Sequence, residues 1–174
     1  MRSDPRLSGF IESSASQFRA YKKLADGALE QIEDASLFEK FSPESNSIPV
    51  LIQHVSGNLR SRWTDFLTAD GEKEWRDRVG EFEEKHVSGE ELLAAWESGW
   101  DILFKSLGAL SPAHLERTVT IRGEKLSVIQ AIQRSLTHAA YHVGQIVYLC
   151  KAMADSEWRS LFIPRSSKLS TSSS

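Results

Sequence analysis

The sequence has little cysteine, no long apolar run and little net charge, and each shortage excludes a class of protein. Its single cysteine, Cys150, cannot form an intramolecular disulfide, which suits a reducing compartment. No stretch approaches the roughly 18 consecutive apolar residues of a membrane-spanning helix, and the opening residues MRSDPRLSGFIESS lack the apolar core of a signal peptide. We therefore expect a cytoplasmic protein with no membrane partner.

The charged residues give no sign of a nucleic-acid partner. The chain has 21 Lys and Arg against 24 Asp and Glu, a net charge of −3 at pH 7, and its basic residues are scattered and form no stripe. A surface that binds phosphate backbones through bulk charge is normally basic. A small-molecule partner is the better expectation.

Apolar residues recur with the 3.6-residue period of an α-helix in four long segments. These segments cover residues 5–32, 47–67, 88–110 and 127–154. Their starts carry capping signals: Asp4 precedes Pro5 at the first, and Ser47, Ser88 and Ser127 open the others. Four helices of this length predict a helical bundle.

The connections between these helices differ in length and composition. Residues 72–85 form a charged run that reads as a long connection, in which Trp75, Val79 and Phe82 can pack back on the body. Before the last helix, TVTIRGEKL alternates β-branched residues around a turn and predicts a short hairpin. The chain is thus predicted to be an all-α four-helix bundle, a single domain over residues 1–165, with a serine-rich disordered tail at 166–174.

Two histidines one helical turn apart, His138 and His142, lie on one face of the last helix. His54, midway along the second helix, is the natural third partner, because bundles build metal sites from side chains on facing helices. Three imidazoles would leave a divalent ion with open positions. The alternative is that each histidine sits at the edge of the core and is satisfied by a carbonyl or carboxylate. His86 and His114 lie in loop-like segments and are expected to be solvated.

A ligating imidazole usually has its second nitrogen fixed by a hydrogen bond. Asn58, Tyr141 and Gln145 are close enough in helical spacing to supply one, as are Gln53 and Arg134. Nitrogen ligands without sulfur favour zinc or nickel, although the sequence does not choose between them.

Three segments of the chain resemble the DinB-like (DinB/YfiT-like) superfamily, in particular a branch of unknown function. They are SIPVLIQHVSGNLRSRW, SLTHAAYHVGQIVYL and the closing EWRSLFIPRSS. The resemblance implies an up-down-down-up bundle, often dimeric, so we expect a homodimer. It also implies a divalent metal held by three histidines, which fall on His54, His138 and His142.

Relatives of this kind include thiol-dependent enzymes that use mycothiol, bacillithiol or glutathione. The resemblance therefore implies an S-transferase that acts on small electrophiles, with a low-molecular-weight thiol as co-substrate. In that case Cys150 is not needed for chemistry. No catalytic residue can be assigned from the sequence.

Two other functions stay open. A metal-dependent hydrolase would use an activated water and needs a general base, but no acidic residue stands at a fixed helical spacing from the histidine pair. Glu97 and Asp101 on the third helix are more readily explained as solvated charges. A non-catalytic, stress-related bundle that binds metal or a small ligand is the third possibility. Trp63, Trp96 and Trp100 are expected in the core or at a dimer interface.

Overall fold

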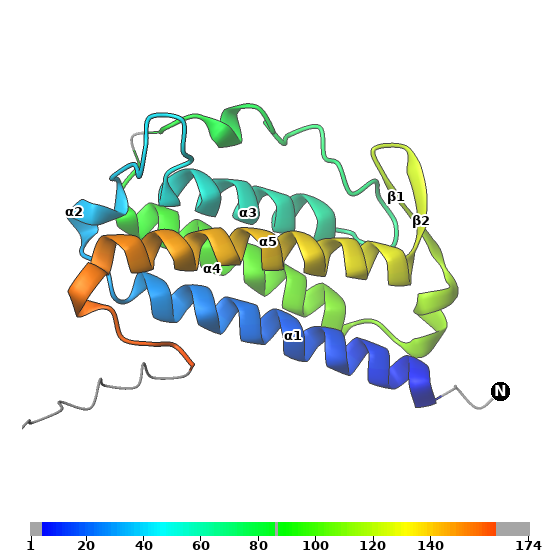
Figure 1. Ribbon diagram of the computed structural model, residues 1–174. Coiled ribbons are helices and arrows are strands. Elements are labelled where there is room, and N and C mark those ends of the chain that lie inside the picture. The colour runs from blue at the N-terminus through cyan, green and yellow to red at the C-terminus, as the bar shows by residue number, and fades with distance from the viewer. Residues whose placement is uncertain (1–4, 86, 163–174) are drawn as a thin grey trace, which may run out of the picture.

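The computed structural model describes residues 5–85 and 87–162, which form a four-helix bundle (Figure 1). The long helices are α1 (Pro5–Leu29), α3 (Ile48–Trp63), α4 (Gly89–Gly108) and α5 (Val128–Ala154), with a short α2 (Asp34–Leu37) between the first two. The predicted fold class is confirmed. The expected cap Asp4, His86, the serine-rich tail and the Ile-Pro-Arg segment at 163–165 lie outside the described residues.

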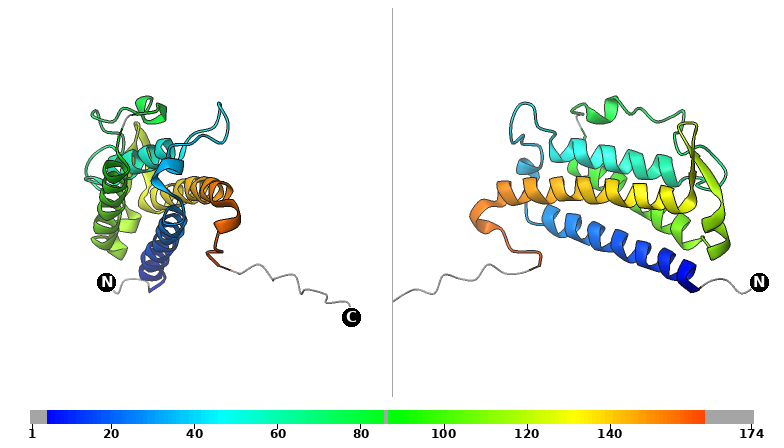
Figure 2. Two further views of the ribbon diagram at one scale, coloured as in Figure 1. Left: turned by 90° about the vertical axis from the view of Figure 1, so that its left-hand side faces the viewer. Right: turned by 45° about the vertical axis from the view of Figure 1, so that its right-hand side comes forward.

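The helices run in an up-down-down-up order. α1 and α5 point one way and α3 and α4 the other (Figure 1). Seen end-on, the order around the bundle is α1, α4, α3, α5 (Figure 2). Among the described residues no helix is long and apolar enough to cross a membrane.

Serine side chains begin three of the helices where the sequence predicts. Ser47 Oγ accepts from the backbone N–H of Val50 over 3.3 Å. Ser88 forms a capping box at α4, and Ser127 forms another at α5. α3 ends at Trp63, earlier than predicted, because the chain turns at Thr64 and Asp65, the latter with φ 51°.

The core is dominated by aromatic side chains. Trp63, Trp96 and Trp100 are at most 1% exposed, which confirms their predicted burial. Phe18 of α1 packs edge-on against Trp63 and Trp100, with ring centroids 6.0 and 6.3 Å away. Trp63 also donates from Nε1 to Ser135 Oγ over 3.0 Å, so α1, α3, α4 and α5 meet around this cluster.

Because α3 and α4 are parallel neighbours, residues 64–88 must carry the chain back along the bundle. This crossover segment runs beside α3 (Figure 1) and contains the short 3-10 helix η1 (Gly80–Phe82). Two more 3-10 helices are η2 (Pro112–Glu116) and η3 (Asp155–Glu157). The predicted hairpin is present as β1 (Thr118–Ile121) and β2 (Glu124–Ser127), paired antiparallel just before α5.

Gly99 allows the parallel helices α3 and α4 to approach closely. A Cβ at this position would lie 3.1 Å from Ser56 Cα and 3.2 Å from Ser56 O, which are backbone atoms of α3 and cannot move alone. We expect Gly99→Ala to lower the free energy of unfolding by about 1–3 kcal/mol, because the helices must separate. Urea denaturation measures this change.

Gly144 on α5 supplies the matched control, since a Cβ there meets nothing within 4 Å. Gly144→Ala should raise the free energy of unfolding by about 0.5–1 kcal/mol through helix propensity. Equal effects of the two substitutions would contradict a packing role for Gly99.

Candidate metal centre

Two helices bring the three predicted histidines together. His54 comes from α3, and His138 and His142 come from successive turns of α5. One ring nitrogen from each lies within 4.8 Å of the others, and the Nε2 atoms of His54 and His138 are 3.0 Å apart. Two nitrogens bound at about 2.0–2.1 Å to one tetrahedral ion are about 3.3 Å apart. The cluster can therefore hold a metal ion.

The three rings are withdrawn from water, and those of His138 and His142 favour the neutral form. His54 and His142 are each 7% exposed, and His138 is half-buried. Burial, together with the charges of the neighbouring His142 and His54, lowers the pKa of His138 to about 3. Burial also lowers the pKa of His142, although its hydrogen bond with Gln145 acts the opposite way. Neutral imidazoles have the free lone pair that a metal requires.

Hydrogen bonds at the outer nitrogens set the tautomers of two rings. His54 Nδ1 lies 3.0 Å from Glu81 Oε2, and His142 Nδ1 lies 2.8 Å from Gln145 Oε1. Because carboxylate and carbonyl oxygens only accept, both Nδ1 atoms carry the proton and donate. The Nε2 atoms of both rings are then the unprotonated ones, and His54 Nε2 accepts from His138 Nε2 over 3.0 Å. The hydrogen bond predicted for Gln145 is present, and its role in orienting a metal ligand stays a prediction.

Glu81 is a candidate site residue that the sequence did not reveal. It is 7% exposed and comes from η1 in the crossover segment. Arg76 donates to its two oxygens from Nε and Nη2, each over 2.8 Å. Burial alone would raise the pKa of Glu81, but the hydrogen bonds from Arg76 and His54 outweigh it and lower that pKa. The carboxylate is therefore a fixed acceptor for His54.

Two neighbours keep Glu81 against α3. A Cβ at Gly57 would overlap Glu81 Oε1, so glycine is needed for the carboxylate to reach His54. Phe82 covers His54, with ring centroids 4.4 Å apart. From the sequence we expect Phe82, in the charged run at residues 72–85, to pack back on the body of the protein. These apolar residues are the one sequence signal that pointed to the segment that carries Glu81.

The other predicted neighbours of the histidines lie differently. Asn58 is buried near His54, but among the described residues no hydrogen bond joins it to a histidine. Tyr141 is 64% exposed and contacts His142 through its ring edge, at 4.9 Å between centroids. Glu97 accepts from Lys22 over 2.7 Å, as a surface charge.

The remaining predicted side chains make contacts away from the three rings. Gln53 donates to the carbonyl of Glu83 over 3.4 Å, and Arg134 pairs with Glu124. His114 is not free in solvent, because its Nδ1 accepts from the backbone N–H of Ser111 over 3.1 Å at the start of η2. None of these contacts adds a donor to the cluster.

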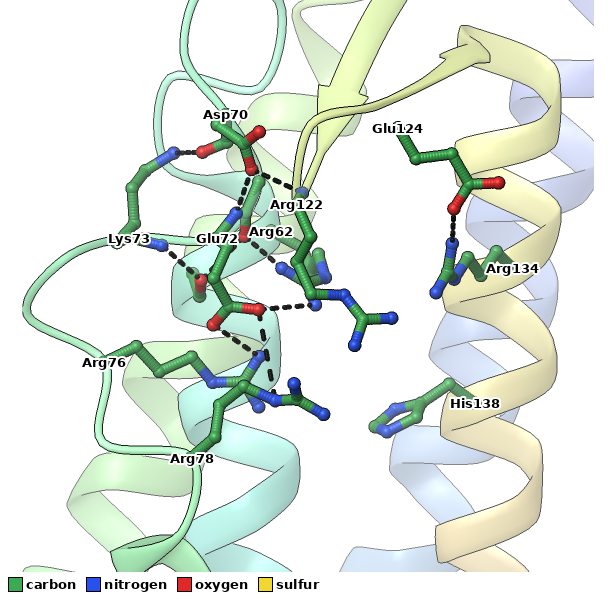
Figure 3. A network of polar contacts seen from close by, with 12 residues as sticks. Arg62, Asp70, Glu72, Lys73, Arg76, Arg78, Arg122, Glu124, Arg134 and His138 are labelled. Carbon is green, nitrogen blue, oxygen red and sulfur yellow. Dashed lines mark hydrogen bonds and ion pairs between the residues drawn. The ribbon is translucent and has the colours of Figure 1, made fainter.

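A cavity of about 280 Å³ opens beside His54 and His138. Part of its wall is apolar, formed by Trp63, Phe66, Phe82 and Ile121. The rest carries five arginines, Arg62, Arg76, Arg78, Arg122 and Arg134, which Figure 3 shows near His138. No aspartate or glutamate is among the described residues that line the cavity. A small ligand can therefore reach two of the three histidines.

Comparison with known protein families gives a match over most of the chain. The family described as "Protein of unknown function (DUF1572)" matches residues 7–167. No curated protein and no solved structure matches the chain.

In metal-free protein we expect the His138 ring to stay neutral well below pH 6.5. Its pKa is about 3 in the folded chain and near 6.5 when unperturbed. The folded state then binds fewer protons than the unfolded state, so stability that is complete above pH 6.5 is lost as the pH falls towards 3. NMR titration of the ring in chelator-treated protein measures the pKa directly.

Urea denaturation at several pH values measures how the free energy of unfolding changes over the same pH interval. His138→Gln removes the titrating ring and should lose less stability over this interval than wild type. A His138 ring that titrates near pH 6.5 in the folded protein would contradict the burial argument.

Proposed function

The chain belongs to the DUF1572 family of proteins of unknown function, and from this premise we propose that it is a divalent-metal-dependent enzyme of the DinB-like type. Its activity would be the transfer of a low-molecular-weight thiol to small electrophiles. One observation carries the proposal: a cluster of three histidines adjoins a cavity large enough for a small molecule. A catalytic metal site needs a position open to a ligand from outside the protein.

The helix directions support the DinB-like assignment. The up-down-down-up order is the one that the resemblance implies (Figure 1). The histidines also come from α3 and α5, the second and fourth long helices, as that resemblance expects. Fold alone does not fix chemistry, so the argument for activity rests on the site.

The donor set fits zinc or nickel, and His54, His138 and His142 would hold the ion. Bound there, it would supply positive charge that makes a thiol or water ligand more acidic. Glu81 and Gln145 accept hydrogen bonds from Nδ1 of His54 and His142. The Nε2 atoms of both rings therefore carry the lone pairs that would bind the ion. The apolar wall formed by Trp63 and its neighbours limits water around the ligand.

The cavity favours a thiol nucleophile over hydrolysis. Hydrolysis needs a general base near the attacking water, and no carboxylate is among the described lining residues. Glu81 is unsuited to this role because hydrogen bonds from Arg76 and His54 occupy it and lower its pKa. By contrast, nearby guanidinium groups favour a thiolate over a thiol.

The protein's own thiol is a poor candidate for the nucleophile. Cys150 is fully buried, and burial raises its pKa to about 12. A thiol with that pKa is almost wholly protonated at neutral pH. The proposal therefore needs an external thiol.

Metal content tests the first half of the proposal. We expect near-stoichiometric zinc or nickel in wild-type protein purified without a tag, and loss of the metal in His54→Ala and His138→Ala. Elemental analysis gives the content, and circular dichroism checks the fold. His114→Ala is the matched control, since His114 caps η2 away from the cluster.

Two further variants test the role of Glu81. Glu81→Gln weakens the acceptor for His54, and Gly57→Ala displaces the carboxylate without changing either partner. Each should weaken metal affinity by about 10–100-fold. A wild-type protein that takes up neither zinc nor nickel on titration would overturn the metal proposal.

Turnover tests the second half. Metal-loaded protein should accelerate the reaction of glutathione, bacillithiol or mycothiol with monochlorobimane, in which the thiol sulfur displaces chloride and fluorescence appears. His138→Ala should abolish the acceleration, and Cys150→Ser should leave it intact. Loss of activity in Cys150→Ser would indicate a protein-thiol mechanism. Thiol-independent cleavage of 4-nitrophenyl acetate would favour the hydrolase, and inactivity in both assays a binding protein.

A further inference from the structure

Five arginines from separate parts of the chain converge on the cavity beside the histidines. Arg62 comes from α3, Arg76 and Arg78 from the crossover segment, Arg122 from the hairpin tip and Arg134 from α5 (Figure 3). In the sequence these residues are scattered, so the concentration of positive charge exists only in the folded chain. It lies beside His138, which lines the same cavity.

Carboxylates neutralise this charge only in part. Glu81 is committed to Arg76 and His54. Glu72 is shared among three arginines, at 3.2 Å from Arg62 Nη2, 3.7 Å from Arg76 Nη1 and 3.9 Å from Arg78 Nε. The last two distances are too long for hydrogen bonds. One carboxylate therefore serves three cations.

The remaining arginines add to the imbalance. Arg134 pairs with Glu124 over 3.2 Å, in an exposed contact. Arg122 has no carboxylate partner among the residues that the structure describes. Four of the five guanidinium groups thus form ion pairs, with the three carboxylates of Glu72, Glu81 and Glu124. Asp70 adds a fourth negative charge at the Arg122 turn, so the arginines still outnumber the carboxylates.

One buried donor at the wall also has no hydrogen-bond partner among the described residues. The side chain of Arg76 is 1% exposed, and its Nη1 is buried without a hydrogen-bond partner in the described part of the chain. Buried polar groups normally have partners, and an exception in a cavity wall calls for a ligand or water. Guanidinium N–H groups bind carboxylate and phosphate oxygens especially well.

The hairpin places Arg122 over the cavity at a conformational cost. Arg122 and Gly123 form the turn, with φ 55° and 75°, and arginine is less suited than asparagine or glycine to the first of these. Asp70 offsets the cost by accepting from both turn amides, over 2.8 and 2.9 Å. Figure 3 shows the guanidinium of Arg122 extending from this tip towards Arg78 and His138.

We propose that this arginine-lined cavity binds a small organic anion, through a carboxylate or phosphate group held by Arg122 and Arg78. The apolar wall of Phe66 and Ile121 would receive an apolar body. A volume of about 280 Å³ has room for on the order of ten non-hydrogen atoms, at the low end of ligand pockets. That this anion is the electrophilic substrate rests on the proposed function. Binding of the anion to the arginines does not require the metal.

Isothermal titration of metal-free, full-length protein at low ionic strength tests the proposal. Benzoate and phenyl phosphate serve as anionic probes, and benzamide as the neutral counterpart of benzoate. Both anions should bind at least 10-fold more tightly than benzamide. Arg122→Gln and Arg78→Gln should each weaken anion binding by about 10-fold, since a hydrogen bond to a charged group contributes about 1.5–3 kcal/mol.

Arg19→Gln is the matched control. It removes the same charge from α1, where Arg19 lies over the Phe104 ring at 5.3 Å and outside the cavity. Thermal melts should match wild type for Arg122→Gln, because its side chain makes no ion pair with the described residues.

The outcomes separate this proposal from the transferase. Equal binding of benzoate and benzamide, or equal weakening by Arg19→Gln, overturns the anion site. Thiol turnover with no preference for anionic electrophiles overturns the identification of the anion as the substrate and leaves the transferase standing. Anion binding that depends on Arg122 and Arg78, in a protein without thiol turnover, supports the anion site and removes only the transferase.

Discussion

The site depends on one buried ion pair, between Arg76 and Glu81. Their side chains are 1% and 9% exposed, and removing either partner would deprive a buried charge of its nearest counter-ion, at a cost of about 3–5 kcal/mol. Both oxygens of Glu81 are bound by Arg76, and one also accepts from His54. The pair therefore fixes the crossover segment on α3 and, through the same carboxylate, the orientation of the ring that faces His138.

The direction of the helices explains why this pair lies where it does. α3 and α4 are parallel, so a long segment must return along the bundle, and it passes beside the helix that carries His54 (Figure 1). Gly57, one turn after His54 on α3, leaves space for the Glu81 carboxylate. A segment that topology requires as a connection thus also completes the site.

Local signals predicted the bundle, the three serine caps, the hairpin and the three histidines, because each depends on spacing within one element. His138 and His142 needed only helical periodicity, and Gln145 was found by its spacing of three from His142. Glu81 and the arginines could not be found in this way. Arg62, Arg78 and Arg122 belong to three separate elements, and only tertiary packing brings their side chains to one cavity.

The histidine cluster and the arginine wall constrain each other electrostatically. A divalent cation is repelled by five neighbouring guanidinium groups, so Glu72 and Glu81 also reduce the positive potential at the histidines. An anion in the cavity would reduce that potential further. Cation and anion binding should therefore be coupled, and by linkage each would raise the other's affinity by the same factor. If carboxylates neutralised all of the arginine charge, the cavity would not attract an anion. If they neutralised none of it, the positive potential would oppose binding of the cation. Glu72, shared among three arginines, leaves the charge between these limits.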